Sequence, residues 1–165
     1  MPRKDLWVRP GHSSYPGDVG RPWSPHRMSW ASSDAARSIM RANKRRDTRP
    51  ELLVRRLLHA RGLRYRVDLR VVQESRTRAD IAFTRQRIAV FIDGCFWHSC
   101  PDHLHLPKAN ADYWVAKLAR NVERDAEVTV LLGSLGWTVL RFWEHVPAEY
   151  AATEIIAAVE LHRGG

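Results

Sequence analysis

The segment from Asp93 to His103 carries the densest group of reactive side chains in the sequence. Within it, Cys95, Cys100 and His103 follow the spacing C-x4-C-x2-H. Thiolate and imidazole groups are the ligands that structural zinc sites use most often. The spacing therefore predicts a zinc site on one short loop. The structural alternative is that the cysteines are two small buried side chains with surface histidines beside them.

A closed zinc site needs a fourth ligand. His145 follows the last predicted strand, and we expect neighbouring strands of one sheet to end close together, so His145 is the first candidate. His105 is the local alternative, and it also competes with His103 for the third position.

A second group is acidic and comes from several elements. Asp80 is an ionisable residue in an otherwise apolar strand, Asp93 ends the next strand, and Glu51 and Asp125 lie on helices that can flank the sheet. Carboxylates that meet at one sheet edge would bind Mg²⁺, which prefers oxygen ligands. Such an ion activates water for attack on a phosphate. His98 is the candidate general base or acid.

Each of these acidic residues also has a structural interpretation. Glu51 completes the capping-box pattern that begins at Thr48. Asp125 pairs with Lys117 on a solvent-exposed helix face, and Asp80 forms a salt bridge on an edge strand. The functional interpretation depends on the occurrence of all four around one hairpin.

A third group is aromatic. Phe96 and Trp97 lie between Gly94 and Pro101, and Tyr113 and Trp114 follow soon after, among basic residues; all are candidates for contact with nucleic acid. Aromatic side chains can enter between base pairs and unstack them. Packing in a core is the alternative, and it is weakest for the pair on the loop, because large aromatic side chains are not usually exposed without a role.

The elements that must position these groups follow from periodicity and turn residues. Alternating or continuous apolar runs predict strands, and spacing of three to four residues predicts helices. We expect helices over 34–43, 48–61, 110–132 and 148–162, and strands over 64–68, 79–83, 88–92 and 137–143. Residues 84–87 join the second and third strands as a hairpin. In the long helix, the apolar face comprises Val115, Leu118, Val122 and Ala126, and the polar face comprises Lys117, Asn121, Arg124 and Asp125.

Composition limits the function further. The 165 residues include 27 Lys and Arg against 18 Asp and Glu, a formal net charge of +9, which indicates a polyanionic partner such as nucleic acid. Residues 1–28 contain five of the nine prolines and are expected to be a disordered tail. There is no apolar run of membrane-spanning length and no apolar signal-peptide core, so we expect no membrane association. Two cysteines suit a reducing cytoplasm.

Six stretches together resemble the very-short-patch-repair (Vsr) DNA mismatch endonucleases over roughly residues 29–147. They are Met40-Arg-Ala, Arg46-Asp-Thr-x-x-Glu51, Ala79-Asp80-Ile-x-Phe83, Asp93-Gly-Cys-Phe-Trp-His98, Asn121-Val-Glu-Arg-Asp125 and Gly136-Trp-x-Val-Leu-x-x-Trp-Glu144. The resemblance implies a nuclease domain over 29–165 of restriction-endonuclease-like α/β fold. Its core is a mixed sheet flanked by helices, with a zinc-bearing loop.

The implied activity is Mg²⁺-dependent hydrolysis by activated water, which nicks duplex DNA 5′ to the thymine of a T:G mismatch left by deaminated 5-methylcytosine. The implied partners are that DNA and other mismatch-repair proteins. We expect a monomer, because one nick needs one active site, and a place in the cytoplasm at the nucleoid.

The resemblance also assigns roles residue by residue. Asp80 and the backbone carbonyl of Ile92 match the magnesium contacts, His98 matches a proton-transfer histidine with Asp125 as its acidic partner, and Glu51 matches a residue near the metal's water shell. Phe96, Trp97 and Trp114 match aromatic residues inserted into DNA. Cys95 matches a zinc ligand, and His145 falls where the family has a cysteine or histidine ligand.

Three features depart from the family pattern. Asp93 stands where a histidine is usual, and either supplies an extra acidic group or orients the loop. Ser99-Cys100-Pro101 replaces a histidine-rich run, and the lysine of many related nucleases is missing at Ile92-Asp93-Gly94.

Two other functions fit the same residues. A restriction-like endonuclease of this fold would cut both strands of matched DNA at other sites. A zinc-containing DNA-binding module would bind DNA without cutting it.

Overall fold

The computed structural model describes residues 46–73 and 75–162. Our predictions for residues 1–28, for the helix over 34–43 and for the motif at Met40 lie outside this part of the chain. The elements are α2 (Arg49–Ala60), β1 (Arg66–Leu69), β2 (Ala79–Phe83), β3 (Ile88–Asp93), α3 (Ala111–Ser134), β4 (Thr138–Trp143) and α4 (Ala148–Leu161). Their order is the predicted one, and each lies within a few residues of its predicted bounds. Within the described residues, no helix is both long and apolar enough to cross a bilayer.

The four strands form one mixed sheet in the order β1-β2-β3-β4. The predicted hairpin is confirmed, because β2 and β3 pair antiparallel with Ile81 opposite Val90. The pair β3–β4 is parallel and is connected through α3, as a parallel pair requires a long crossover connection. The structure therefore confirms the predicted α/β class with a mixed sheet between helices.

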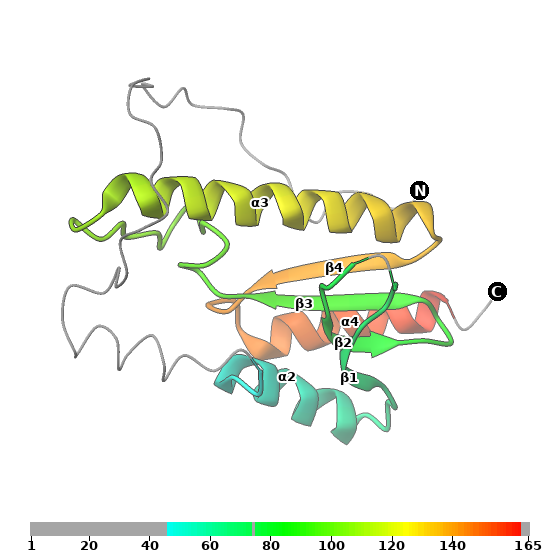
Figure 1. Cartoon of the computed structure of the whole chain (residues 1–165). Coiled ribbons are helices and arrows are strands. Elements are labelled where there is room, and N and C mark those ends of the chain that lie inside the picture. The colour runs from blue at the N-terminus through cyan, green and yellow to red at the C-terminus, as the bar shows by residue number, and fades with distance from the viewer. Residues whose placement is uncertain (1–45, 74, 163–165) are drawn as a thin grey trace. The chain divides into compact units, whose positions relative to one another are not determined.

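The sheet is covered on both faces (Figure 1). Helices α2 and α4 cover one face, where Leu58 and Ile155 pack on Ile81 and Val90. Helix α3 covers the other face, where Leu132 and other side chains pack on small residues of the strands. The strand residues Ala79, Ala82 and Ala89 have short side chains, which let α3 approach the sheet closely. Polar groups on the helix can therefore reach the strands.

The predicted faces of α3 are wrong in part, although Leu118 is buried and Arg124 is exposed as expected. The residues that this helix buries are Trp114, Leu118, Asp125, Val128 and Leu132, whereas Val115 is 39% exposed and Ala126 is exposed. Asp125 thus lies on the buried face and not on the solvent-exposed one. Helix periodicity alone did not reveal this, because the partners that make the burial of Asp125 acceptable come from other elements.

The parallel register of β3 and β4 brings two distant segments to one end of the sheet. Asp93 at the end of β3 pairs with Trp143 at the end of β4, and the Glu144 N–H donates to the Asp93 carbonyl over 2.9 Å. The loop after β3 and the turn after β4 therefore begin side by side, which places His145 next to the cysteine-bearing loop.

Candidate active site and metal centre

Four potential metal ligands meet where β3 and β4 end. Ligand atoms of Cys95, Cys100, His103 and His145 all lie within 4.8 Å of one another. The Cys95 Sγ lies 3.1 Å from His145 Nδ1, and the Cys100 Sγ lies 3.6 Å from His103 Nδ1 and 3.8 Å from His145 Nδ1. His105, the local alternative, does not belong to this group.

The geometry and chemistry of this group fit a tetrahedral zinc ion. With usual zinc–ligand bond lengths, the ligand atoms around zinc are separated by roughly 3.3–3.8 Å, close to the shorter distances found here. Both cysteines are buried and free. Burial and the neighbouring thiol of Cys100 raise the pKa of Cys95 to about 12, and a cation is what would favour the thiolate form needed for metal binding. Four protein ligands leave no open position, so such a site is structural.

Backbone hydrogen bonds shape the loop that follows β3. The His98 N–H donates to the Gly94 carbonyl over 3.1 Å, and the Cys100 N–H donates to the Cys95 carbonyl over 2.8 Å. From the other strand, Glu144 accepts the Cys95 N–H over 2.7 Å through Oε1. This loop therefore carries its aromatic residues and His98 on a compact turn attached to the sheet.

Asp80 lies on β2, an interior strand, and its carboxylate accepts the Ile92 N–H over 2.7 Å. Burial is the main effect that raises the pKa of Asp80 to about 7, and the charges of Glu51 and Asp93 add to it. Arg55 reaches only its backbone carbonyl, over 3.4 Å. The edge-strand salt bridge considered from the sequence is thus wrong for the described residues, because β2 is not an edge strand.

Glu51 and Arg55 form a separate buried pair on α2. The Arg55 Nη2 donates to Glu51 over 2.7 Å, and its Nη1 donates to Asp47 over 2.6 Å. Glu51 also accepts the Asp47 N–H and the Thr48 hydroxyl. The expected capping box does not form, because the Thr48 side chain makes no capping hydrogen bond to the backbone. Both oxygens of Glu51 therefore have structural partners at the start of the helix.

His98, Asp93 and Asp125 gather around a residue that the sequence analysis did not select, Arg141 on β4. The His98 Nδ1 lies 2.6 Å from Asp125 Oδ2 and 3.6 Å from Asp93 Oδ1. Burial lowers the pKa of His98, but the hydrogen bond to Asp125 and the two negative charges outweigh it, so the pKa is raised. Burial raises the pKa of Asp125, but the hydrogen bonds and charges of His98 and Arg141 outweigh burial. The pKa of Asp125 is therefore lowered.

The four acidic residues have different partners. Asp93 and Asp125 pair with Arg141 and Glu51 pairs with Arg55, whereas Asp80 lies close enough to Glu51 and Asp93 to feel the charge of both. Two patterns in the sequence are signals of the buried arginines, although our predictions did not use them. Arg141 is a charged residue in an apolar strand, as Asp80 is, and Glu51 and Arg55 have the i, i+4 spacing of a helix ion pair.

The aromatic residues form a cluster between the loop and α3. Phe96 contacts Trp97 and Trp114 edge-on, with ring centroids 5.1 and 5.2 Å apart, and Tyr113 contacts Trp114 in the same way. Trp114 is only 5% exposed, so it lies beneath Phe96 and Trp97, which are half-buried. Asn121 on α3 donates to the Trp97 carbonyl over 3.0 Å and so ties the loop to the helix.

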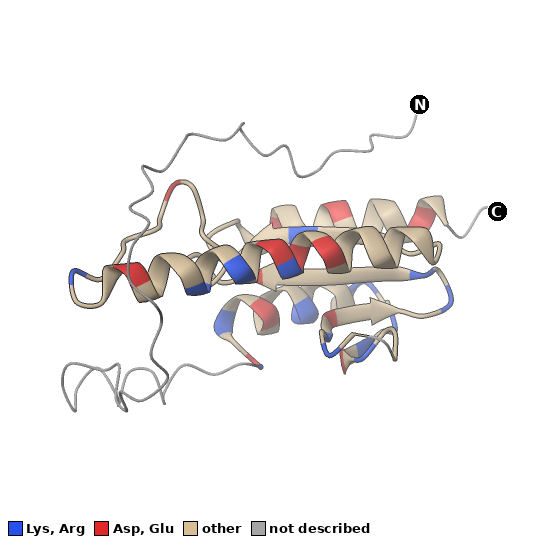
Figure 2. Ribbon diagram, turned by 45° about the horizontal axis from the view of Figure 1, so that its top comes forward, with Lys and Arg blue, Asp and Glu red and all other residues tan. Residues whose placement is uncertain are grey.

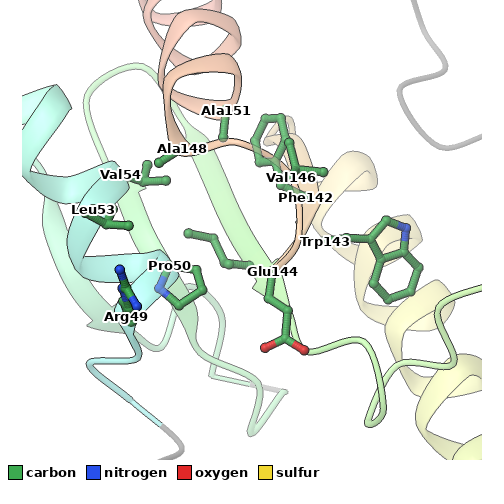
Figure 3. Close-up of a pocket in the computed structure, with 11 residues that line it drawn as sticks. Arg49, Pro50, Leu53, Val54, Phe142, Trp143, Glu144, Val146, Ala148 and Ala151 are labelled. Carbon is green, nitrogen blue, oxygen red and sulfur yellow. The ribbon is translucent and has the colours of Figure 1, made fainter. Parts of the chain in front are cut away.

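A pocket of about 270 Å³ opens on the other side of the sheet, where α2 and α4 begin (Figure 3). Its walls are mostly apolar, and Arg49 and Glu144 contribute charged groups. Among the candidate site residues, Ile92 also lines this pocket, whereas His98 and Asp125 lie outside it.

Charge is distributed unevenly over the surface (Figure 2). Acidic and basic residues alternate along α3, whereas exposed arginines gather on β1, the loops beside it and the hairpin turn. These arginines are Arg64, Arg66, Arg70, Arg76, Arg78, Arg85 and Arg87. Such a surface favours contact with phosphate groups.

Comparison with known proteins identifies a matching family model and two kinds of relative, type II nicking enzymes and a mismatch endonuclease. The family model described as DNA mismatch endonuclease Vsr matches residues 31–102. The chain is 48% identical over 119 residues to the type II nicking enzyme V.NaeI of Lentzea aerocolonigenes, an alignment covering 71% of this chain and 72% of that protein. It is 37% identical over 120 residues to the type II nicking enzyme V.NmeDIP of Neisseria meningitidis serogroup C, covering 72% and 79%.

A third relative is named for mismatch cleavage. The chain is 37% identical over 106 residues to the DNA mismatch endonuclease Vsr of Escherichia coli strain K12, an alignment covering 64% of this chain and 66% of that protein.

Proposed function

Because the chain belongs to the Vsr family of DNA mismatch endonucleases, we propose that it nicks duplex DNA 5′ to the thymine of a T:G mismatch. As a DNA endonuclease it is a hydrolase of phosphodiester bonds. The proposed role is very short patch repair of deaminated 5-methylcytosine, carried out by residues 29–165 on DNA at the nucleoid, by a monomer alongside other mismatch-repair proteins.

The observation that carries the catalytic part of this proposal is the isolated charge of Asp80. In the described part of the chain, Glu51, Asp93 and Asp125 each pair with an arginine, but the Asp80 carboxylate has only the Ile92 N–H. A half-buried carboxylate that forms no ion pair with an arginine side chain, and that feels the charges of two other acids, fits a divalent cation. Asp80 and the Ile92 carbonyl would hold Mg²⁺, which supplies Lewis-acid activation of water and stabilises the leaving 3′ oxygen.

Within this proposal, His98 transfers a proton at the attacking water. In the described residues, the side-chain hydrogen bond of His98 uses Nδ1 alone, and a carboxylate can only accept, so Nδ1 carries a proton. Nε2 is then the nitrogen that faces the reaction. In the hydrolysis, the water oxygen bonds to phosphorus and the bond from phosphorus to the 3′ oxygen breaks.

The aromatic and zinc sites would act on recognition. Phe96 and Trp97 are the rings we propose to enter the DNA stack, which is weaker at a mismatch than in matched DNA. Trp114 supports them from below in this conformation. Zinc would fix the loop that carries these rings and His98.

Labelled duplexes test the proposed substrate. We expect a single-strand nick 5′ to the thymine in a T:G duplex with Mg²⁺, and much slower nicking of the matched T:A and C:G duplexes. Double-strand cuts in matched DNA would instead support the restriction-like endonuclease. Tight binding with no cut in any duplex would support the DNA-binding module.

Trp97→Ala should reduce mismatch discrimination more than general affinity for DNA. Base–aromatic stacking contributes about 1–3 kcal/mol, so the ratio of T:G to matched cleavage should fall roughly tenfold or more. Matched-duplex affinity, measured by fluorescence anisotropy, should change less than threefold. Tyr150→Ala is the control, since Tyr150 is a half-exposed aromatic residue on α4. An unchanged cleavage ratio would remove Trp97 from recognition.

A further inference from the structure

Arg141 is a buried cation at the centre of the group that contacts His98. Its side chain is only 7% exposed, and its guanidinium lies 4.9 Å from the centre of the Phe91 ring. Its Nε and Nη2 each donate to Asp93 over 2.7 Å, in the bidentate arrangement that arginine forms with carboxylates. These contacts fix Arg141 between the sheet and α3.

One nitrogen of Arg141 contacts both carboxylates. Nη2 bonds Asp93 Oδ1 and also lies 3.2 Å from Asp125 Oδ1. The remaining oxygen of Asp125, Oδ2, lies 2.6 Å from His98 Nδ1. The oxygen of Asp93 nearest to His98 is Oδ1, which accepts from Nη2 of Arg141. It lies 3.6 Å from His98 Nδ1.

The carboxylates of Asp93 and Asp125 therefore compete for Nδ1 of His98, and the contacts of Arg141 determine which of them binds it. We propose that Arg141 is a positioning residue that withdraws Asp93 from His98 and directs Asp125 to it, so that Nε2 of His98 faces the scissile phosphate. This inference rests on the proposed function. It also assigns Asp93 an orienting role instead of a direct catalytic one.

The experiment compares Arg141→Met with the double variant Asp93→Asn/Arg141→Met in the full-length, zinc-loaded protein. Without Arg141, the Asp93 charge is free to draw the imidazole away, so kcat for T:G nicking should fall at least tenfold while KM changes less than twofold. In the double variant the competing charge is absent, and kcat should return to within threefold of the wild-type value. Arg56→Met is the control, because Arg56 is exposed on α2, outside both the site and the arginine group around β1.

A second readout does not depend on activity. Long-range ¹H–¹⁵N correlation spectra report which imidazole nitrogen of His98 carries the proton. We expect a proton on Nδ1 in the wild-type protein and in the double variant, and a changed pattern in Arg141→Met. A folded Arg141→Met protein with wild-type kcat and spectrum overturns the proposal.

The remaining outcomes are also decisive. A folded double variant with kcat at least tenfold below wild type shows that Arg141 does not act through Asp93, and overturns the proposal. If Arg141→Met alone does not fold, the double variant decides on its own, because it lacks both charges of the Asp93–Arg141 pair and Asp125 still has His98 as a partner. If the wild-type protein does not nick T:G duplexes, the proposed function fails, while the spectra still test the role of Arg141.

Discussion

Replacing Asp80 with alanine is expected to abolish Mg²⁺-dependent nicking. Among Glu51, Asp80, Asp93 and Asp125, Asp80 is the residue whose carboxylate forms no ion pair with an arginine, and so is the group best suited to bind Mg²⁺. Loss of a Lewis acid that contributes several kcal/mol should lower the rate by on the order of 10³-fold or more. Single-turnover cleavage of a labelled T:G duplex measures this effect, and affinity for the duplex in Ca²⁺ should remain within about threefold.

A second substitution separates chemistry from folding. Asp80→Asn keeps an oxygen that can accept the Ile92 N–H but removes the charge, so it should fold normally and still fail to cut. Asp112→Asn is the matched control, since Asp112 is exposed in the first turn of α3. Nicking by Asp80→Asn at more than a tenth of the wild-type rate would contradict the assignment of Asp80 as a metal ligand.

Loss of zinc is the second large effect that we expect. Freshly purified wild-type protein should contain about one zinc ion per chain, and His103→Ala or Cys100→Ser should lose it. The Cys100 side chain is completely buried, so its unpaired polar replacement should also destabilise the fold. We expect Tm to fall by roughly 10 °C, since each kcal/mol shifts Tm by about 2–4 °C in a chain of this size.

The matched control for this site is His105→Ala. His105 is exposed and lies two residues from His103, but it is outside the ligand group. It should retain zinc, Tm and activity, all measured on the same preparations by elemental analysis, calorimetry and cleavage. Wild-type zinc content in His103→Ala, or loss of zinc in His105→Ala, would contradict the assignment of ligands.

Nicking should fail in zinc-depleted protein because the loop after β3 loses its position, while the rest of the fold remains. Chelation removes the link between the loop after β3 and His145, and that loop carries Trp97 and His98. The strands and the two cores contain none of the four ligands, so circular dichroism should retain most of the helical signal. Full activity after verified zinc removal would show that the ion does not position the loop.

The sequence alone predicted the elements of the described part of the chain, the hairpin and the group of four potential metal ligands. The first two depend on local periodicity and turns, which a single chain expresses directly. The proximity of His145 to Cys95 followed from one further step, because parallel neighbouring strands end at the same edge of a sheet.

Only the tertiary structure decided which polar groups are buried together. The position of Asp125 along α3 is compatible with either the polar or the buried face of the helix. It can be buried because Arg141 from β4 and His98 from the loop pair with it. Arg55 on α2 is buried for the same reason, with Glu51 beside it. Burying a charge is unfavourable unless a partner compensates it. That partner comes from a distant part of the chain, so local patterns do not specify it.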